Sequence, residues 1–218
     1  MKIEDQIQDL LLDRYHNPHE NSLCNCGKGT RIVRCRYDGC FQSPTTCIDC
    51  FVTAHKYNPF HWALLWDVKK RIWVRRGLSD LSADFEIQLG HVFEQEKCSV
   101  KCSGTKEAIP FIITHINGVH NTRIRFCGCL FAPEKHTQLI QSELFPATVE
   151  EPRSAFTFAV LKQFNMHNLQ SKCGAFDYVL SLRRLTDNVF TARVAVSLNN
   201  DVRHSLTRSR TCTRRFWW

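Results

Sequence analysis

Apolar side chains near the start of the chain recur at the spacing of a helix. Ile3, Ile7, Leu10 and Leu11 stand at i, i+4, i+7 and i+8, which places them on one stripe of a helical surface. Pro18, inside the polar run NPHENS, cannot continue a helix. The pattern therefore predicts a short amphipathic helix within residues 1–23.

The next segment, residues 24–61, has few long apolar runs and is predicted to be irregular. Such a segment rarely folds without a disulfide or a structural metal, because it buries too little apolar surface. Beyond it, HWALLWDV at 61–68 predicts a strand, and LSDLSADFEIQLG at 78–90 predicts a loop that leads into a helix.

The second half of the chain predicts a hairpin followed by helices. Two β-rich runs flank Asn117-Gly118, the dipeptide that most favours a type I′ turn. PEKHTQLIQSELF predicts a helix that stops at Pro146, and SAFTFAVLKQFNMHNLQ predicts one with Ser154 as its N-cap. AFDYVLSLRRLTDN predicts a last helix with an apolar face of Phe176, Val179, Leu180 and Leu182. A weak boundary between two parts of the chain is expected at residues 145–154.

Composition narrows the class of protein. Of the 218 residues 43% are hydrophobic, which is enough for a core, but no apolar run is long enough to span a membrane. The acidic residues within the N-terminal pattern exclude a secretory signal, so we expect a chain that is not secreted. Twelve cysteines in such a chain are better explained as thiolate ligands or free thiols than as disulfides.

The net charge of +8 is unevenly distributed. KKRIWVRR at 69–76 surrounds Trp73, and a basic patch that contains an aromatic side chain is compatible with nucleic acid. Residues 202–218 carry five arginines and no acid, and we interpret this run as a solvated or disordered tail. Charge alone does not assign a function.

Short-spaced cysteines and histidines predict metal binding. The residues are, in chain order, Cys24, Cys26, Cys35, Cys40, Cys47, Cys50, His55 and His61. Zinc favours pairs from one tight turn, and the alternation of these pairs predicts two interleaved, cross-braced sites as in small modules of the ZZ or B-box type. Cys24, Cys26, Cys47 and Cys50 would hold one Zn²⁺, and Cys35, Cys40, His55 and His61 the other. The alternatives are a redox pair at Cys47 and Cys50, a cysteine–histidine nucleophile, and chance clustering of structural cysteines.

A second, looser group follows. It consists of His91, Cys98, Cys102, His115, His120, Cys127 and Cys129. Cys127 and Cys129, with Cys98 and either His91 or His120, predict a third zinc site, because side chains at i and i+2 point to one side of a strand. The alternative is that His115 and His120 simply belong to the hairpin. Cys173 and Cys212 are isolated and are expected to be ordinary residues.

The ordered set CIDCFVTAHKYNPFHWALLWD, IQLGHVFEQEKC, INGVHNTRIRFCGC, SELFPATVEEPRSAFTFAVLKQFNMHNLQSK and FDYVLSLRRLTDN resembles a known family. It is similar, from Cys24 to Asn188, to the CxC-type cysteine cluster domain found N-terminal to the catalytic core of KDZ (Kyakuja–Dileera–Zisupton) transposases of fungi. The Cys35–Cys40 gap is wider than the two-residue gap expected in that family. After LTDN the chain departs from the family pattern, so 189–218 is expected to be an atypical basic tail.

The resemblance implies a zinc-chelating domain that assists a transposase, by binding DNA or by scaffolding a complex in the nucleus. It carries ligand roles to Cys47, Cys50, His55 and His61. The later motifs correspondingly match His91, Cys98, His120, Cys127 and Cys129.

The expected fold class is α+β: a small, irregular, zinc-stapled module, a β-hairpin region and C-terminal helices. The expected divisions are 1–23 (amphipathic helix), 24–66 (zinc cluster), 67–145 (second part of the cysteine cluster domain, with the hairpin), 146–188 (helices) and 189–218 (tail).

Three classes of function have unequal support in the sequence. A DNA-binding or assembly module is expected, with DNA, a transposase or another protein as partner, and with neither a membrane nor a small-molecule substrate. A zinc-dependent protein-interaction module without DNA binding is the alternative. An enzyme is not expected, because Asp177 and Asp187 qualify as catalytic carboxylates by residue type alone.

Overall fold

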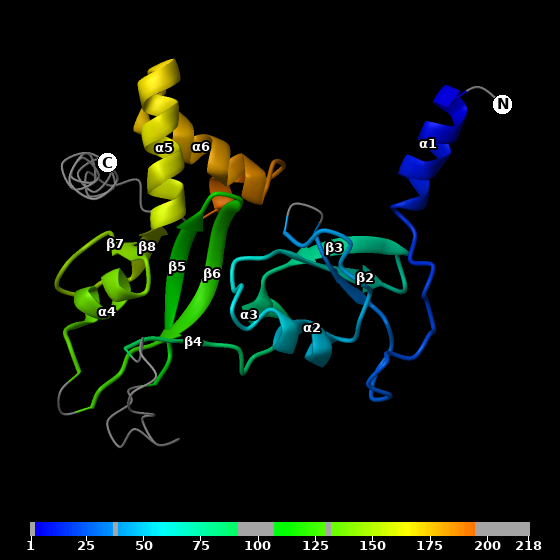
Figure 1. The fold of residues 1–218 in the computed structure, drawn as a ribbon, viewed down its shortest axis with the longest axis horizontal. Coiled ribbons are helices and arrows are strands. Elements are labelled where there is room, and N and C mark those ends of the chain that lie inside the picture. Colours follow the sequence, from blue (N-terminus) through cyan, green and yellow to red (C-terminus); the bar gives the residue numbers. More distant parts are fainter. Residues whose placement is uncertain (1–2, 37–38, 91–106, 130–131, 195–218) are drawn as a thin grey trace. The chain divides into compact units, whose positions relative to one another are not determined.

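The computed structural model describes residues 3–36, 39–90, 107–129 and 132–194, and these form two compact units divided between Phe85 and Glu86 (Figure 1). Both units combine helices with a sheet, so the predicted α+β class is confirmed. Residues 145–154 lie within the second unit, where they join two paired strands.

The first unit begins with helix α1 (Ile3–Asp13), as the apolar stripe predicts. Three antiparallel strands follow in the order β1–β2–β3: β1 (Val33–Cys35), β2 (Ala63–Asp67) and β3 (Ile72–Arg76). Helix α2 (Ile48–Ala54) lies between β1 and β2 in the chain, and the short α3 (Leu78–Leu81) follows β3.

The two faces of this sheet differ. Val33 and Ala63 are fully buried on one face, and Phe51 of α2 is buried as well. The opposite face carries Arg34, Leu64 and Arg75 in one cross-strand row, because β1 pairs Arg34 with Leu64 and β3 pairs Arg75 with Leu64. Buried side chains lie on both faces, because Trp66, on the same face as Leu64, is 3% exposed.

The second unit is built on a five-stranded mixed sheet in the order β4–β6–β5–β8–β7. Its strands are β4 (Ile87–Gln88), β5 (Ile109–His115), β6 (Gly118–Arg125), β7 (Leu144–Pro146) and β8 (Ser154–Thr157). Its helices are α4 (Lys135–Gln141), α5 (Phe158–Ser171) and α6 (Ala175–Thr186), with a 3₁₀ turn η1 (Thr191–Arg193) after them. α5 and α6 pack through Phe164, Tyr178 and Val179 against Phe156 of β8.

Several local predictions are corrected. The hairpin forms, but its turn residues are Ile116 and Asn117, since His115 pairs with Gly118. The Thr186 hydroxyl of α6 accepts a hydrogen bond from Val119 N at 2.7 Å and lies against Gly118, whose φ is +134°. Neither turn residue has the positive φ that a type I′ turn requires.

Ser154 is not a helix N-cap. It begins β8, and Thr157 caps α5 instead by accepting a hydrogen bond from Val160 N at 3.3 Å. The segment 78–90 holds α3 and then strand β4 rather than a loop and a longer helix. In α6, Tyr178 is buried in place of Phe176, which is exposed.

Candidate metal centres

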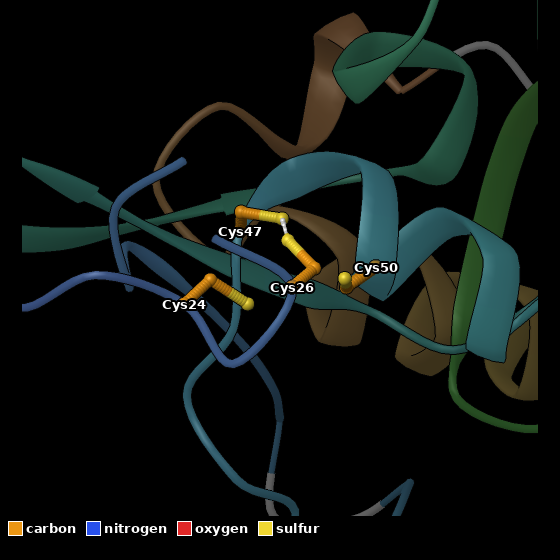
Figure 2. A group of neighbouring side chains, drawn as sticks. All are labelled: Cys24, Cys26, Cys47 and Cys50. Carbon is orange, nitrogen blue, oxygen red and sulfur yellow. Dashed lines mark hydrogen bonds between the residues drawn. The ribbon is translucent and has the colours of Figure 1, made fainter. Parts of the chain in front are cut away.

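The four-cysteine cluster consists of Cys24, Cys26, Cys47 and Cys50, whose sulfurs converge from two segments (Figure 2). A tight turn supplies the first pair, closed by the bridge between Leu23 and Thr30. Cys24 N donates to Gly29 O at 2.7 Å, and Gly27 turns the chain at a φ of +73°. This conformation favours glycine, so Gly27 allows Cys24 and Cys26 to face the same point.

The second pair comes from the start of α2. Cys47 is the N-cap of this helix and Cys50 lies in its first turn. Thr46, just before, pairs with Val33 of β1 and so ties the helix start to the sheet. The cluster is therefore positioned by backbone pairing that does not itself require metal.

The sulfurs of this cluster are close enough to affect each other's ionisation. Cys26 and Cys47 Sγ atoms are 3.6 Å apart. Backbone amides of Cys26 and Cys47 lower the pKa of Cys24 to about 6, whereas the Cys26 and Cys47 side chains raise the pKa of Cys50. Cys24 thus forms a thiolate readily, whereas Cys50 resists a second negative charge beside it. A bound dication would remove this repulsion between the sulfurs.

The two-cysteine, two-histidine cluster consists of Cys35, Cys40, His55 and His61. Cys40 Sγ lies 3.4 Å from His55 Nε2 and 3.3 Å from His61 Nδ1, and Cys35 Sγ lies 3.8 Å from the same His61 nitrogen. Cys35 ends β1 and His55 caps the C-terminus of α2. Helix α2 therefore carries the four-cysteine cluster at one end and this cluster at the other.

The orientation of His55 is set by α2. Its Nδ1 lies 2.9 Å from the carbonyl oxygen of Phe51, and its ring stacks on Phe51 with centroids 4.0 Å apart. With the proton on Nδ1, Nε2 is left as a lone-pair donor that faces Cys40. A carbonyl that orients the outer nitrogen is the usual support of a metal-binding histidine.

Both clusters are compact enough to hold one metal ion each. The ligand atoms within each lie within 4.8 Å of one another. Zn–S bonds of ~2.3 Å and Zn–N bonds of ~2.0 Å give tetrahedron edges of roughly 3.5–3.8 Å. Thiolate and imidazole suit zinc, and each cluster offers four protein ligands, as in closed structural sites. The grouping is the interleaved one that the residue order predicts; zinc itself remains a prediction.

Gly39 provides a test of the two-cysteine, two-histidine cluster. A Cβ at this position would lie 2.7 Å from Cys35 Sγ and 3.2 Å from the His61 ring. Gly39→Ala is therefore expected to weaken metal binding at this cluster by about tenfold or more. Competition with a chromogenic chelator measures the change, and the four-cysteine cluster serves as internal control. Equal loss from both clusters, or from neither, would contradict the close approach.

Cys127 and Cys129 follow β6, and α4 holds them in place. Cys127 N donates to Gln138 Oε1 at 2.9 Å, and Gln138 Nε2 donates to Cys127 O at 3.0 Å and to Pro133 O at 2.8 Å. Cys129 N points at Cys127 Sγ, 3.4 Å away, and the Cys127 side chain raises the pKa of Cys129. The pair is preorganised on one side, but the described residues bring no third metal-binding side chain to it.

His120 does not join this pair. It lies near the hairpin turn, where its Nε2 is 2.8 Å from Asn117 Oδ1. At ~3.3 Å per residue, the end of β6 at Arg125 is about 17 Å away, and Cys127 lies beyond. His120 and the Cys127–Cys129 pair therefore belong to the same hairpin strand and its extension, but they lie at opposite ends of it. His115 instead contacts Thr157 Oγ1 at 2.9 Å.

His91, Cys98 and Cys102 lie outside the described residues, as does Cys212, so the predicted third site is not tested by the structure. Cys173 is a free cysteine in no cluster. Three supporting residues were missed from the sequence: Gln138, Gly39 and Phe51. Only Gly39, adjacent to Cys40, gave a signal, since glycine beside a ligand often marks close approach.

Comparison with known protein families matches residues 79–190 to the CxC2 like cysteine cluster associated with KDZ transposases. No curated protein and no solved structure matches the chain. The match begins well after Cys24, where the resemblance was expected to start, so the two clusters of the first unit lie before it and rest on their own geometry. The pair at Cys127 and Cys129 lies inside it, with the Gln138 that supports it. Because the match covers just over half of the sequence, the chain belongs to the family of CxC2-like cysteine clusters associated with KDZ transposases.

Proposed function

We propose that this chain is a zinc-stapled DNA-binding module that serves a KDZ-type transposase in the nucleus. The observation that carries the proposal is the basic, aromatic face of the β1–β2–β3 sheet, the face that carries Arg34, Leu64 and Arg75. Residues 24–76, which hold both metal clusters, contain ten basic and three acidic side chains. Such a surplus on a small zinc module favours phosphate contacts.

Arginines on this face are paired with tryptophans. The Arg34 guanidinium lies 4.2 Å from the centre of the Trp73 ring, and that of Arg75 lies 4.7 Å from Trp62. Cation–π stacking fixes long side chains and lowers the entropy lost on binding a phosphate. At the β2–β3 turn, Lys69 and Lys70 are exposed and add mobile charge beside them.

Zinc has a structural role in this proposal. Four protein ligands close each cluster, so that no position is left for water or substrate. The proposal therefore includes no catalytic step, and the module acts by binding. A zinc-dependent protein-interaction module is the second candidate, favoured by the exposed apolar stripe of α1.

Charge reversal at the β2–β3 turn tests DNA binding. Lys69→Glu with Lys70→Glu is expected to weaken binding of duplex DNA by about tenfold or more at 100 mM salt. It should also reduce the slope of log affinity against log salt by about 2, because two phosphate contacts are lost. Fluorescence anisotropy of a labelled duplex between about 50 and 200 mM NaCl gives both quantities.

The matched control reverses two exposed charges of the second unit, Lys162→Glu with Arg184→Glu. It changes net charge equally and should leave the slope unchanged. Equal losses in the two double variants would mean that overall charge, not this face, attracts DNA. A chain that binds no duplex, or binds it without salt dependence, would refute the proposal in favour of protein interaction.

A further inference from the structure

Helix α1 exposes an apolar stripe that no other part of the chain described by the structure buries. Every described residue from 3 to 16 is exposed, and no residue of α1 is buried. Ile3, Ile7, Leu10 and Leu11 are between 51% and 74% exposed. An isolated helix of eleven residues is marginal in water, so this stripe needs an apolar partner to stay helical.

The first unit also has a groove of about 580 Å³ between the segment that follows α1 and the sheet. Its lining includes Leu11 of α1 itself, Arg14, Arg34, Leu64, Arg71 and Trp73, and Arg71 forms an ion pair with Glu20 at 3.5 Å. Its walls are held together: Trp73 Nε1 donates to His16 O at 3.3 Å, and Arg34 Nη2 donates to Arg14 O at 2.6 Å. The lining therefore combines apolar side chains with three arginines.

Charge complementarity identifies what fits this groove. Helix α1 carries Glu4, Asp5, Asp9 and Asp13 and no basic residue, so an acidic amphipathic helix exists on the same chain as a cationic apolar groove. Pairing two α1 stripes directly would bring their like charges together, which is unfavourable. Docking α1 against the arginine-lined groove removes that repulsion and covers both apolar surfaces.

Only the C-terminal end of α1 reaches its own groove, where Leu11 forms part of the lining; Ile3 and Ile7 do not line it. Asp13, the last residue of α1, is joined directly to Arg14, which lines the groove. The chain is then fixed at His16 by Trp73 and at Asn17, whose Nδ2 donates to Arg31 O at 3.0 Å. No free residues remain in which the chain could reverse. We propose that α1 of each chain docks into the groove of a second copy, giving a reciprocal two-fold dimer.

A matched pair of substitutions tests the stripe. Ile7 and Leu12 are 52% and 53% exposed on the same helix, but lie roughly 140° apart around its axis. In the zinc-loaded full chain, Ile7→Glu is expected to raise the dimer dissociation constant by about a hundredfold, and Leu12→Glu by no more than a few-fold. Sedimentation equilibrium measures both. An unmodified chain that stays monomeric up to about 100 µM, or equal effects of the two substitutions, would overturn the proposal.

Mixing two variants tests the groove. Arg71→Glu reverses a groove charge, and each of the Arg71→Glu and Ile7→Glu chains alone should dimerise poorly. Their mixture retains one native helix facing one native groove, so it should form a heterodimer more tightly than either variant associates with itself. Failure of the mixture to associate would overturn the groove assignment. Because Arg34 and Trp73 line the groove and also belong to the face proposed to bind DNA, dimerisation and DNA binding compete for these residues. The Lys69→Glu/Lys70→Glu chain should still dimerise, which separates the two tests.

Discussion

Replacing Cys47 with serine is expected to remove one zinc ion per chain and to unfold the part of the first unit around α2. Cys47 is 5% exposed and is both a member of the four-cysteine cluster and the N-cap of α2. Binding of a structural zinc contributes on the order of 10 kcal/mol, which is as large as the whole stability of a typical domain. Little core remains to compensate, because few large side chains of this unit are buried.

Two measurements check this outcome. Elemental analysis gives zinc per chain, and hydrogen exchange followed by mass spectrometry reports protection of the peptides that contain β1 and α2. A strong chelator added to the unmodified chain should produce the same loss of protection. Cys173→Ser is the matched control, since Cys173 is a half-buried free cysteine outside both clusters. Retention of metal and protection by the Cys47→Ser chain would show that the cluster is not a zinc site.

Gly90→Ala is expected to destabilise the second unit by about 3 kcal/mol or more. Gly90 has a φ of +91°, and a Cβ there would lie 2.5 Å from Cys127 Cβ and 2.7 Å from Gln138 Oε1. The substitution therefore combines backbone strain with overlap against a buried amide. Gln138 could move only by giving up its hydrogen bonds to Cys127, which are shielded from water.

Urea unfolding followed by far-ultraviolet circular dichroism measures the change in free energy of the second unit. Gly174→Ala serves for comparison. The nearest atom to a Cβ at Gly174 is the end of the Asp177 side chain at 3.1 Å, and φ there is ordinary, so the cost should be about 1 kcal/mol or less. Similar losses in the two variants would mean that Gly90 is not held against Cys127.

The two clusters of the first unit were predictable because zinc chemistry is local in sequence. Each pair of ligands comes from one turn or one helical turn, so spacing and residue type specify the pairs. The order of the pairs then favours interleaving. The Cys35–Cys40 gap is wider than the family pattern, so spacing alone did not specify the geometry of the second cluster. In the structure Gly39, within that gap, lies against both Cys35 and His61.

The second unit was less predictable because its contacts are distant in sequence. Thr157 rather than Ser154 caps α5 because the preceding residues pair with β5 and β7 as a strand. The hairpin turn lies one residue earlier than predicted, and Thr186, far along the chain, accepts a hydrogen bond from Val119 N beside it. His120 lies on the strand that leads to Cys127. Side-chain alternation predicts on which face of the sheet a residue lies, but the prediction overlooked the distance along the strand that separates His120 from Cys127.

The described residues contain no helix long and apolar enough to cross a membrane. The four carboxylates of α1 are repelled by an anionic lipid surface.

The interleaved order of the ligands has a consequence for how the chain is made. The four-cysteine cluster cannot be completed until Cys50 has emerged from the ribosome, and the other cluster waits for His61. At roughly 5–20 residues per second, the two events are separated by about a second. Cys35 and Cys40 are then already enclosed in the loop that the first metal closes, which shortens the search for the second. The four-cysteine cluster should therefore fill first during synthesis and the two-cysteine, two-histidine cluster second, so that metal supply would limit how much of the doubly loaded chain accumulates.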